Sequence, residues 1–80
     1  MLSQLKDFTL DKEFRITIFS DKIHIINYSR IDTITDNKLI IRNNNDKILI
    51  TGAKFYLLKL LDNELLMQGN IKNIEVFNNE

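Results

Sequence analysis

The stretch from Lys47 to Phe77, KILITGAKFYLLKLLDNELLMQGNIKNIEVF, decides the fold that the sequence predicts. It holds both glycines of the chain, Gly52 and Gly69, and each glycine stands between two apolar runs. Glycine has no Cβ, so it permits a bulge or a sharp bend where a strand ends. We therefore interpret the stretch as one β unit used twice, with Gly52 and Gly69 as its structural glycines.

The segment from Ala53 to Gln68 inside this stretch allows two interpretations. It lacks proline and ends before a glycine, so it could form a helix with that glycine at its C-terminal cap. On a helical wheel, however, its polar residues scatter around the whole circumference and leave no apolar stripe. This scatter favours two strands, 54–60 and 64–68, joined by a turn at Asp62 and Asn63.

The preceding part of the chain alternates apolar and polar residues at the period of two that is typical of strands. A polar turn after Ile18 predicts one hairpin. The four-residue loop from Asn43 to Asp46 predicts another, because asparagine and aspartate tolerate positive φ. The strands predicted before the second of these loops are 15–18, 23–25, 31–34 and 38–42.

These patterns predict one all-β domain, a small antiparallel sheet folded as a sandwich of seven or eight short strands. Residues 15–77 make up this domain, and 80 residues suffice for only one. Residues 1–14 are a lead-in whose apolar spacing allows a short N-terminal helix. Residues 78–80 are a polar tail.

Composition excludes several classes of function. Eleven basic and eleven acidic residues balance, so no net field favours nucleic acid or anionic lipid. Without cysteine, and with His24 as the single histidine, the chain has no cluster for zinc, and we expect no metal or cofactor. No apolar run approaches the length of a membrane helix, so we expect a cytoplasmic protein without direct membrane insertion. The absence of proline and the many isoleucines, asparagines and lysines are typical of a low-GC bacterium.

Three strands carry three consecutive apolar residues, at 39–41, 48–50 and 65–67. Strand side chains alternate between faces, so such triplets indicate burial on both faces. Either the second face is ordinary surface with leftover hydrophobic residues, or it is closed by a second copy or by another protein. The candidate association face consists of Ile40, Leu49, Leu58 and Leu66.

A different class of function would be a small ligand-binding or enzymatic β domain with a polar pocket around His24, Tyr28 and Asp32. His24 lies between two isoleucines and has no partner in the sequence, which is typical of a structural histidine. Asp32 stands near turn-forming residues, whereas paired catalytic carboxylates need a pocket that separates their pKa values. The glycines are too far apart for a phosphate-binding loop. We therefore predict no catalytic residues.

A series of short motifs runs in order through the chain: RITI at 15–18, IINY at 25–28, I-x-G at 50–52 and E-L-x-x-x-G-x-I-x-x-I at 64–74. Their order and spacing resemble the YabP/YqfC family of sporulation proteins over most of the chain. Phe14 stands where that family often has a proline, and the asparagine-rich loop lacks the glycine that is common in that turn.

The resemblance implies an all-β protein of endospore-forming bacteria, without enzymatic activity, cofactor or catalytic residue. It also implies a candidate partner, a membrane-associated sporulation protein encoded nearby. The leading hypothesis is therefore a non-enzymatic sporulation protein that acts by protein-protein interaction in the cytoplasm of the sporulating cell. Its partner would be that protein or a second copy of the chain.

Overall fold

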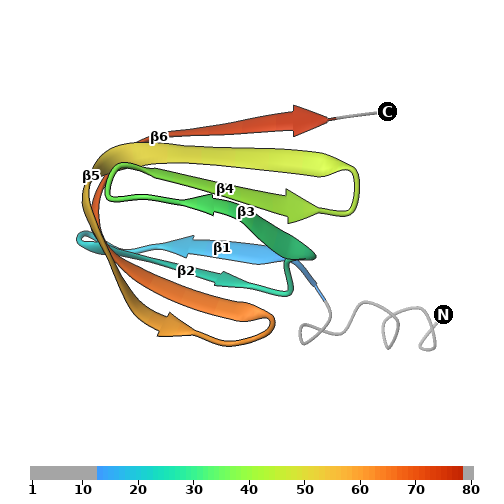
Figure 1. Cartoon of the computed structure of the whole chain (residues 1–80), viewed down its shortest axis with the longest axis horizontal. Helices are drawn as coiled ribbons and strands as arrows, with labels where there is room; N and C mark the ends of the chain where they lie inside the picture. The colour runs from blue at the N-terminus through green and yellow to red at the C-terminus, as the bar shows by residue number, and fades with distance from the viewer. Residues whose placement is uncertain (1–12, 79–80) are drawn as a thin grey trace, which may run out of the picture.

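The structure is a computed structural model that describes residues 13–78 of the chain. These residues form six β-strands and no helix (Figure 1). The short N-terminal helix that the sequence allows within residues 1–14 falls mostly on residues 1–12, outside the described residues, and Glu13 and Phe14 are not helical. The strands are β1 (Arg15–Ile18), β2 (Lys22–Ile26), β3 (Arg30–Ile34), β4 (Lys38–Asn43), β5 (Asp46–Leu60) and β6 (Glu64–Asn78).

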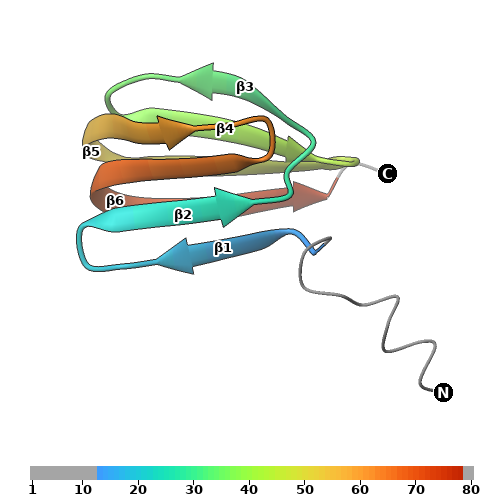
Figure 2. The same ribbon diagram turned by 90° about the horizontal axis from the view of Figure 1, so that it is seen from below.

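All six strands belong to one antiparallel sheet in the order β1-β2-β6-β5-β4-β3. The two central strands, β5 and β6, have 15 residues each and bend together, so the sheet folds over on itself (Figures 1 and 2). As a result, the pairing of β2 with β6 is limited to the start of β6, and the pairing of β4 with β5 is limited to the start of β5. The bend divides each of these two strands into two halves. In β5 the first half is 46–51 and the second half is 56–60; in β6 the first half is 64–68 and the second half is 73–78.

The all-β prediction is confirmed, and the two strands predicted between Ala53 and Gln68 are present. The sandwich of seven or eight short strands is wrong. The predicted strands on either side of each glycine are one continuous strand, because backbone pairing persists through the bend, where Gly52 lies opposite Ile71. Register shifts on both sides absorb the change of direction, so the sheet bends without a break.

Both glycines lie at this bend, and each fits where a side chain would not. A Cβ on Gly52 would stand 1.9 Å from the backbone oxygen of Asn70. Gly69 has a φ of 149°, and a Cβ there would stand 2.7 Å from the ring of Phe55 and 2.9 Å from the backbone oxygen of Lys54. The two strands can therefore cross the bend in close contact only where the side chain is missing.

The core lies between the inner faces of the two halves of the folded sheet. β2 and the first half of β6 contribute alternate residues from one side, and β4 and the first half of β5 contribute them from the other. Tyr28 and Phe55 complete the cluster. The largest fully buried side chains are Ile23, Ile25, Leu39, Ile41, Ile48, Ile50, Leu65 and Met67.

The hairpin between β4 and β5 is confirmed, but its loop is shorter than predicted. Asn43 pairs directly with Asp46, which leaves Asn44 and Asn45 as the two turn residues. Asn44 has a φ of 58°, in the left-handed region that asparagine tolerates. A two-residue hairpin turn is enough to reverse the chain, so the four-residue loop that was predicted is not needed.

Candidate interaction surface

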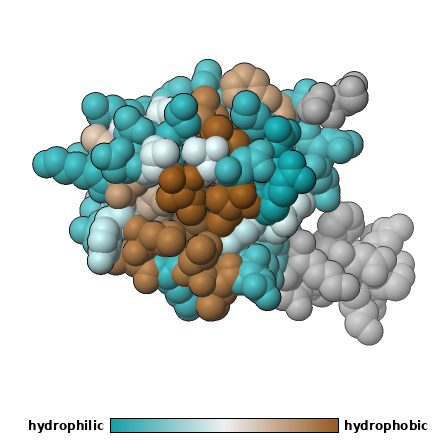
Figure 3. Space-filling view, in the orientation of Figure 1, coloured by the Kyte–Doolittle hydropathy of each residue, from teal (hydrophilic) through white to brown (hydrophobic). Residues whose placement is uncertain are grey.

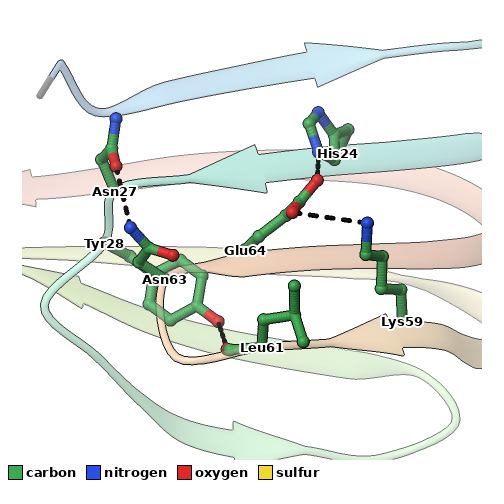
Figure 4. Close-up of polar contacts among 7 residues, drawn as sticks. All are labelled: His24, Asn27, Tyr28, Lys59, Leu61, Asn63 and Glu64. Carbon is green, nitrogen blue, oxygen red and sulfur yellow. Dashed lines mark hydrogen bonds and ion pairs between the residues drawn. The ribbon is translucent and has the colours of Figure 1, made fainter. Parts of the chain in front are cut away.

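The link between β2 and β3 is tied to the turn between β5 and β6 by hydrogen bonds from consecutive residues (Figure 4). The backbone nitrogen of Asn27 donates to the backbone oxygen of Asn63 at 2.7 Å, and their side-chain amides meet at 3.3 Å. The buried Tyr28 donates its hydroxyl to the backbone oxygen of Leu61 at 3.0 Å. Burial raises the pKa of Tyr28, and Asp62 and Glu64 add to the shift, so this hydroxyl keeps its proton at neutral pH. Two loops far apart in sequence are therefore joined by both backbone and side-chain hydrogen bonds.

These contacts leave an open groove of about 750 Å³ between the start of β3 and the end of β5. The buried Tyr28 and two charged residues, Arg30 and Asp62, contribute to its lining. The lining residues are Tyr28, Ser29, Arg30, Ile31, Leu60, Leu61, Asp62 and Asn63.

Apolar side chains surround this groove and remain exposed. Leu60 is 49% exposed and Leu61 is 53% exposed, although both are large and apolar. Figure 3 shows apolar side chains gathered over β3 and the second half of β5, on the face where the two strands lie nearest the viewer. We define the apolar patch as Ile31, Ile34, Leu58, Leu60 and Leu61.

The two strands that border the apolar patch have irregular edges. β3 carries a register shift at Asp32, between its pairs with Ile41 and Ile40. The second half of β5 carries another shift at Leu58, and Lys54 before it has a φ of 59°. A bulged edge is a poor template for an added strand. The patch is therefore suited to receiving side chains rather than to extending the sheet.

A polar network flanks the patch on the outer face of β2 and β6 (Figure 4). His24 Nε2 lies 2.7 Å from one carboxylate oxygen of Glu64, and Lys59 Nζ lies 3.5 Å from the other. The hydrogen bond with His24 lowers the pKa of Glu64, and Lys59 contributes further. Both carboxylate oxygens of Glu64 therefore have a partner within the chain, next to the apolar patch.

Asp32 is paired with two arginines on the outer face of β3 and β4. Its carboxylate accepts hydrogen bonds from Arg42 Nε at 2.7 Å and from Arg30 Nε at 2.9 Å. These bonds, the one from Arg42 first, hold the pKa of Asp32 below its ordinary value of 3.8. The bulge at Asp32 places its side chain between the two arginines.

The lowered pKa values of Asp32 and Glu64 predict acid sensitivity. Each carboxylate binds its proton more weakly in the folded than in the unfolded chain. Their contribution to the free energy of unfolding is therefore complete above the ordinary carboxyl range near pH 4, and it is lost as pH falls through the folded pKa values. We expect the urea midpoint of unfolding to fall between pH 5 and pH 3. Asp32→Asn should make that fall shallower, and Asp36→Asn, at an exposed turn residue, should not. Identical profiles for the two variants would contradict the role of the arginine pairs.

The structure does not bring His24, Tyr28 and Asp32 into one pocket. Tyr28 lines the groove, His24 bonds Glu64 on the outer face of β2, and Asp32 bonds the arginines on the outer face of the other half of the sheet. The polar pocket that the sequence suggested is therefore not formed by these three residues.

The candidate association face is likewise divided. Ile40 and Leu49 lie opposite each other on the outer face of one half of the sheet. Leu66 lies opposite His24 on the outer face of the other half. Leu58 lies at the bulge of β5, where it joins the apolar patch. The four residues therefore do not form one surface, because the folded sheet turns its two outer faces away from each other.

Leu60, Leu61 and Glu64 belong to this surface, although no role was predicted for them from the sequence. The signal for the leucines was the run YLLKLL at 56–61, which holds more large apolar residues than one strand face can bury. The bond between Glu64 and His24 had no signal, since it depends on the pairing of β2 with β6.

Residues 13–78 contain no group of three or more histidine, cysteine or acidic residues placed to hold a metal ion. Nor does this part of the chain contain a helix long and apolar enough to cross a membrane. Comparisons with models of protein families, with curated proteins and with solved structures find no match to the chain.

Proposed function

We propose that the chain is a non-enzymatic sporulation protein that acts by binding another protein during endospore formation. The order of motifs between Arg15 and Phe77, which resembles the YabP/YqfC family and YqfC most of all, supports the sporulation role. The apolar patch supports the binding activity, and it is the single observation that carries it. The partner in this proposal is a membrane-associated sporulation protein, which the chain binds from the cytoplasm.

The chemistry of the apolar patch is that of a protein interface. Its centre, Leu60 and Leu61, is apolar and exposed, while Arg30 and Asp62 offer hydrogen bonds at the margin. Protein interfaces have this arrangement of an apolar centre within a polar rim. Apolar side chains of the partner would enter the groove, and water would leave the surface of the two leucines.

Co-purification from sporulating cells tests the proposal, with tagged wild-type protein and two variants. Leu61→Asp places a charge at the centre of the patch, and its exposed side chain makes this change compatible with folding. Tyr56→Asp is the matched control, because Tyr56 is 68% exposed and lies outside the groove lining. We expect wild type and Tyr56→Asp to retain a membrane-associated sporulation protein, and Leu61→Asp to reduce its recovery by about tenfold or more.

Two outcomes would contradict different parts of the proposal. Equal recovery of the partner by Leu61→Asp and Tyr56→Asp would show that binding does not use the apolar patch. Equal expression of the chain in vegetative and sporulating cells would contradict the sporulation role. If Leu61→Asp then reduced the recovery of a partner from vegetative cells, binding through the apolar patch would still be supported.

A further inference from the structure

The folded sheet has a second opening, on the side opposite the apolar patch. There the end of β1 and the adjoining turn face the second half of β6 across a groove lined by 18–20 and 71–74. Figure 2 shows β1 at the margin of the molecule opposite to β3. Ile18 is 56% exposed and Val76 is 58% exposed at this opening. It is therefore a separate apolar surface.

The strand edges at this opening are regular, unlike those at the apolar patch. The second half of β6 pairs with the first half of β5 through six consecutive residues, 73–78, without a register shift. β1 pairs with β2 through all four of its residues, also without a shift. Among residues 13–78, no strand pairs with the other side of either segment. Regular unpaired edges with exposed apolar side chains are templates for an added strand.

The two edges complement each other in sequence and direction. β1 and the second half of β6 point in opposite directions (Figure 1), so two copies can pair them antiparallel. In the register that covers the exposed side chains, Ile16 lies opposite Val76 of the second copy, and Ile18 lies opposite its Ile74. All four belong to inner faces, because their partners within the chain are Ile25, Ile23, Ile48 and Ile50.

The outer face of the same register is complementary in charge. Thr17 lies opposite Glu75 of the second copy, and Arg15 lies opposite its Phe77, one diagonal step from that glutamate. Long side chains reach such diagonal neighbours, and arginine binds both carboxylates and aromatic rings. Each copy presents β1 and β6 at the same opening, so one two-fold axis can form both strand pairs at once.

From this complementarity we infer that the chain forms a two-fold dimer in which β1 of each copy pairs antiparallel with the second half of β6 of the other. The dimer joins the two folded sheets through two equivalent ladders and covers Ile18 and Val76. It leaves the apolar patch free on the far side. The inference depends only on the strand edges and is independent of the proposed sporulation role.

Disulfide trapping tests the register directly, because the chain has no cysteine of its own. Residues directly opposite in an antiparallel pair have Cα atoms about 4.5 to 5.5 Å apart, which suits a disulfide. We expect an equimolar mixture of Thr17→Cys and Glu75→Cys proteins to form a covalent heterodimer under mild oxidation. A mixture of Lys38→Cys and Glu75→Cys proteins is the control and should not, since Lys38 lies on the interior strand β4. Equal cross-linking in both mixtures would overturn the inference.

Charge exchange supplies a test that needs no cross-link. Arg15→Glu and Glu75→Arg should each weaken dimerisation about tenfold in analytical ultracentrifugation, and the double variant should recover it. Circular dichroism of each variant verifies that the fold is retained. Monomeric wild-type protein at a concentration of about 100 μM, or a double variant no better than the single ones, would overturn the dimer.

Discussion

Gly52→Val is expected to cost the domain about 3 kcal/mol or more in free energy of unfolding. A Cβ at this position would lie 1.9 Å from the backbone oxygen of Asn70, and a backbone atom within a ladder cannot move aside cheaply. Overpacking of this kind costs about 1 to 3 kcal/mol where the neighbours can adjust, and more where they cannot. Since a chain of 80 residues has a total stability of about 4 to 12 kcal/mol, a loss of about 3 kcal/mol removes roughly a quarter to three quarters of it.

Chemical denaturation followed by circular dichroism measures this effect. Gly69→Val should also destabilise the domain, because its φ of 149° is unfavourable for a β-branched residue and its Cβ would meet the ring of Phe55. Thr51→Val is the control, since it places the same side chain one residue before Gly52 at an ordinary strand position. A Gly52→Val protein as stable as Thr51→Val would disprove the close crossing of β5 and β6.

Ile50→Lys is expected to unfold the domain, whereas Leu49→Lys should leave it folded. Ile50 is fully buried in the core, and an ammonium group without a partner there costs several kcal/mol. Leu49 points to the outer face, where it lies opposite Glu75, so a lysine would meet a carboxylate and solvent. The two substitutions are chemically alike and adjacent in sequence, and only the alternation of the strand separates their effects.

Far-UV circular dichroism and thermal melting of both variants decide the matter. A cooperative melt for Leu49→Lys and none for Ile50→Lys is the expected pair of results. The reverse pattern would mean that the inner and outer faces of β5 are exchanged. Leu49→Lys also separates the fold from association, because the proposed dimer uses β1 and β6 and should survive this change.

The local pattern of the sequence predicts the strands well, because the period of two is a property of the chain itself. Ile48 and Ile50 share one face of β5, as their alternation indicates, and the structure shows that this face is the buried one. The hairpin at Asn44 follows from residue chemistry in the same way. Local pattern therefore accounts for which residues form strands and for which residues share a face, but three consecutive apolar residues do not say which face is buried.

The strand count and the surfaces depend on tertiary structure, which the pattern does not contain. Gly52 and Gly69 look like strand ends in the sequence, but they lie at one shared bend and keep the ladder intact. Ile40 and Leu66 look equivalent, but the bend turns their faces apart. Leu61 is exposed because the edges of β3 and β5 do not pair with each other. The periodicity of the sequence carries no information about which strand edges remain unpaired.

The strand order also determines how the chain can fold. Every neighbouring pair in the sheet is a hairpin between consecutive strands, except for β2 with β6. Hairpins close short loops, whereas joining Ile26 to Glu64 closes one that contains most of the domain. We expect this long-range closure to limit the folding rate, because the entropy of closing the loop is lost before the contacts between β2 and β6 stabilise the chain.

Leu65→Ala removes a side chain of β6 where that strand pairs with β2, so it should slow refolding in stopped-flow experiments. Leu39→Ala lies in the β4 hairpins and should mainly speed unfolding. If both substitutions change only the unfolding rate, β2 pairs with β6 after the transition state of folding. The four-stranded meander from β3 to β6 would then be the part that is formed in the transition state.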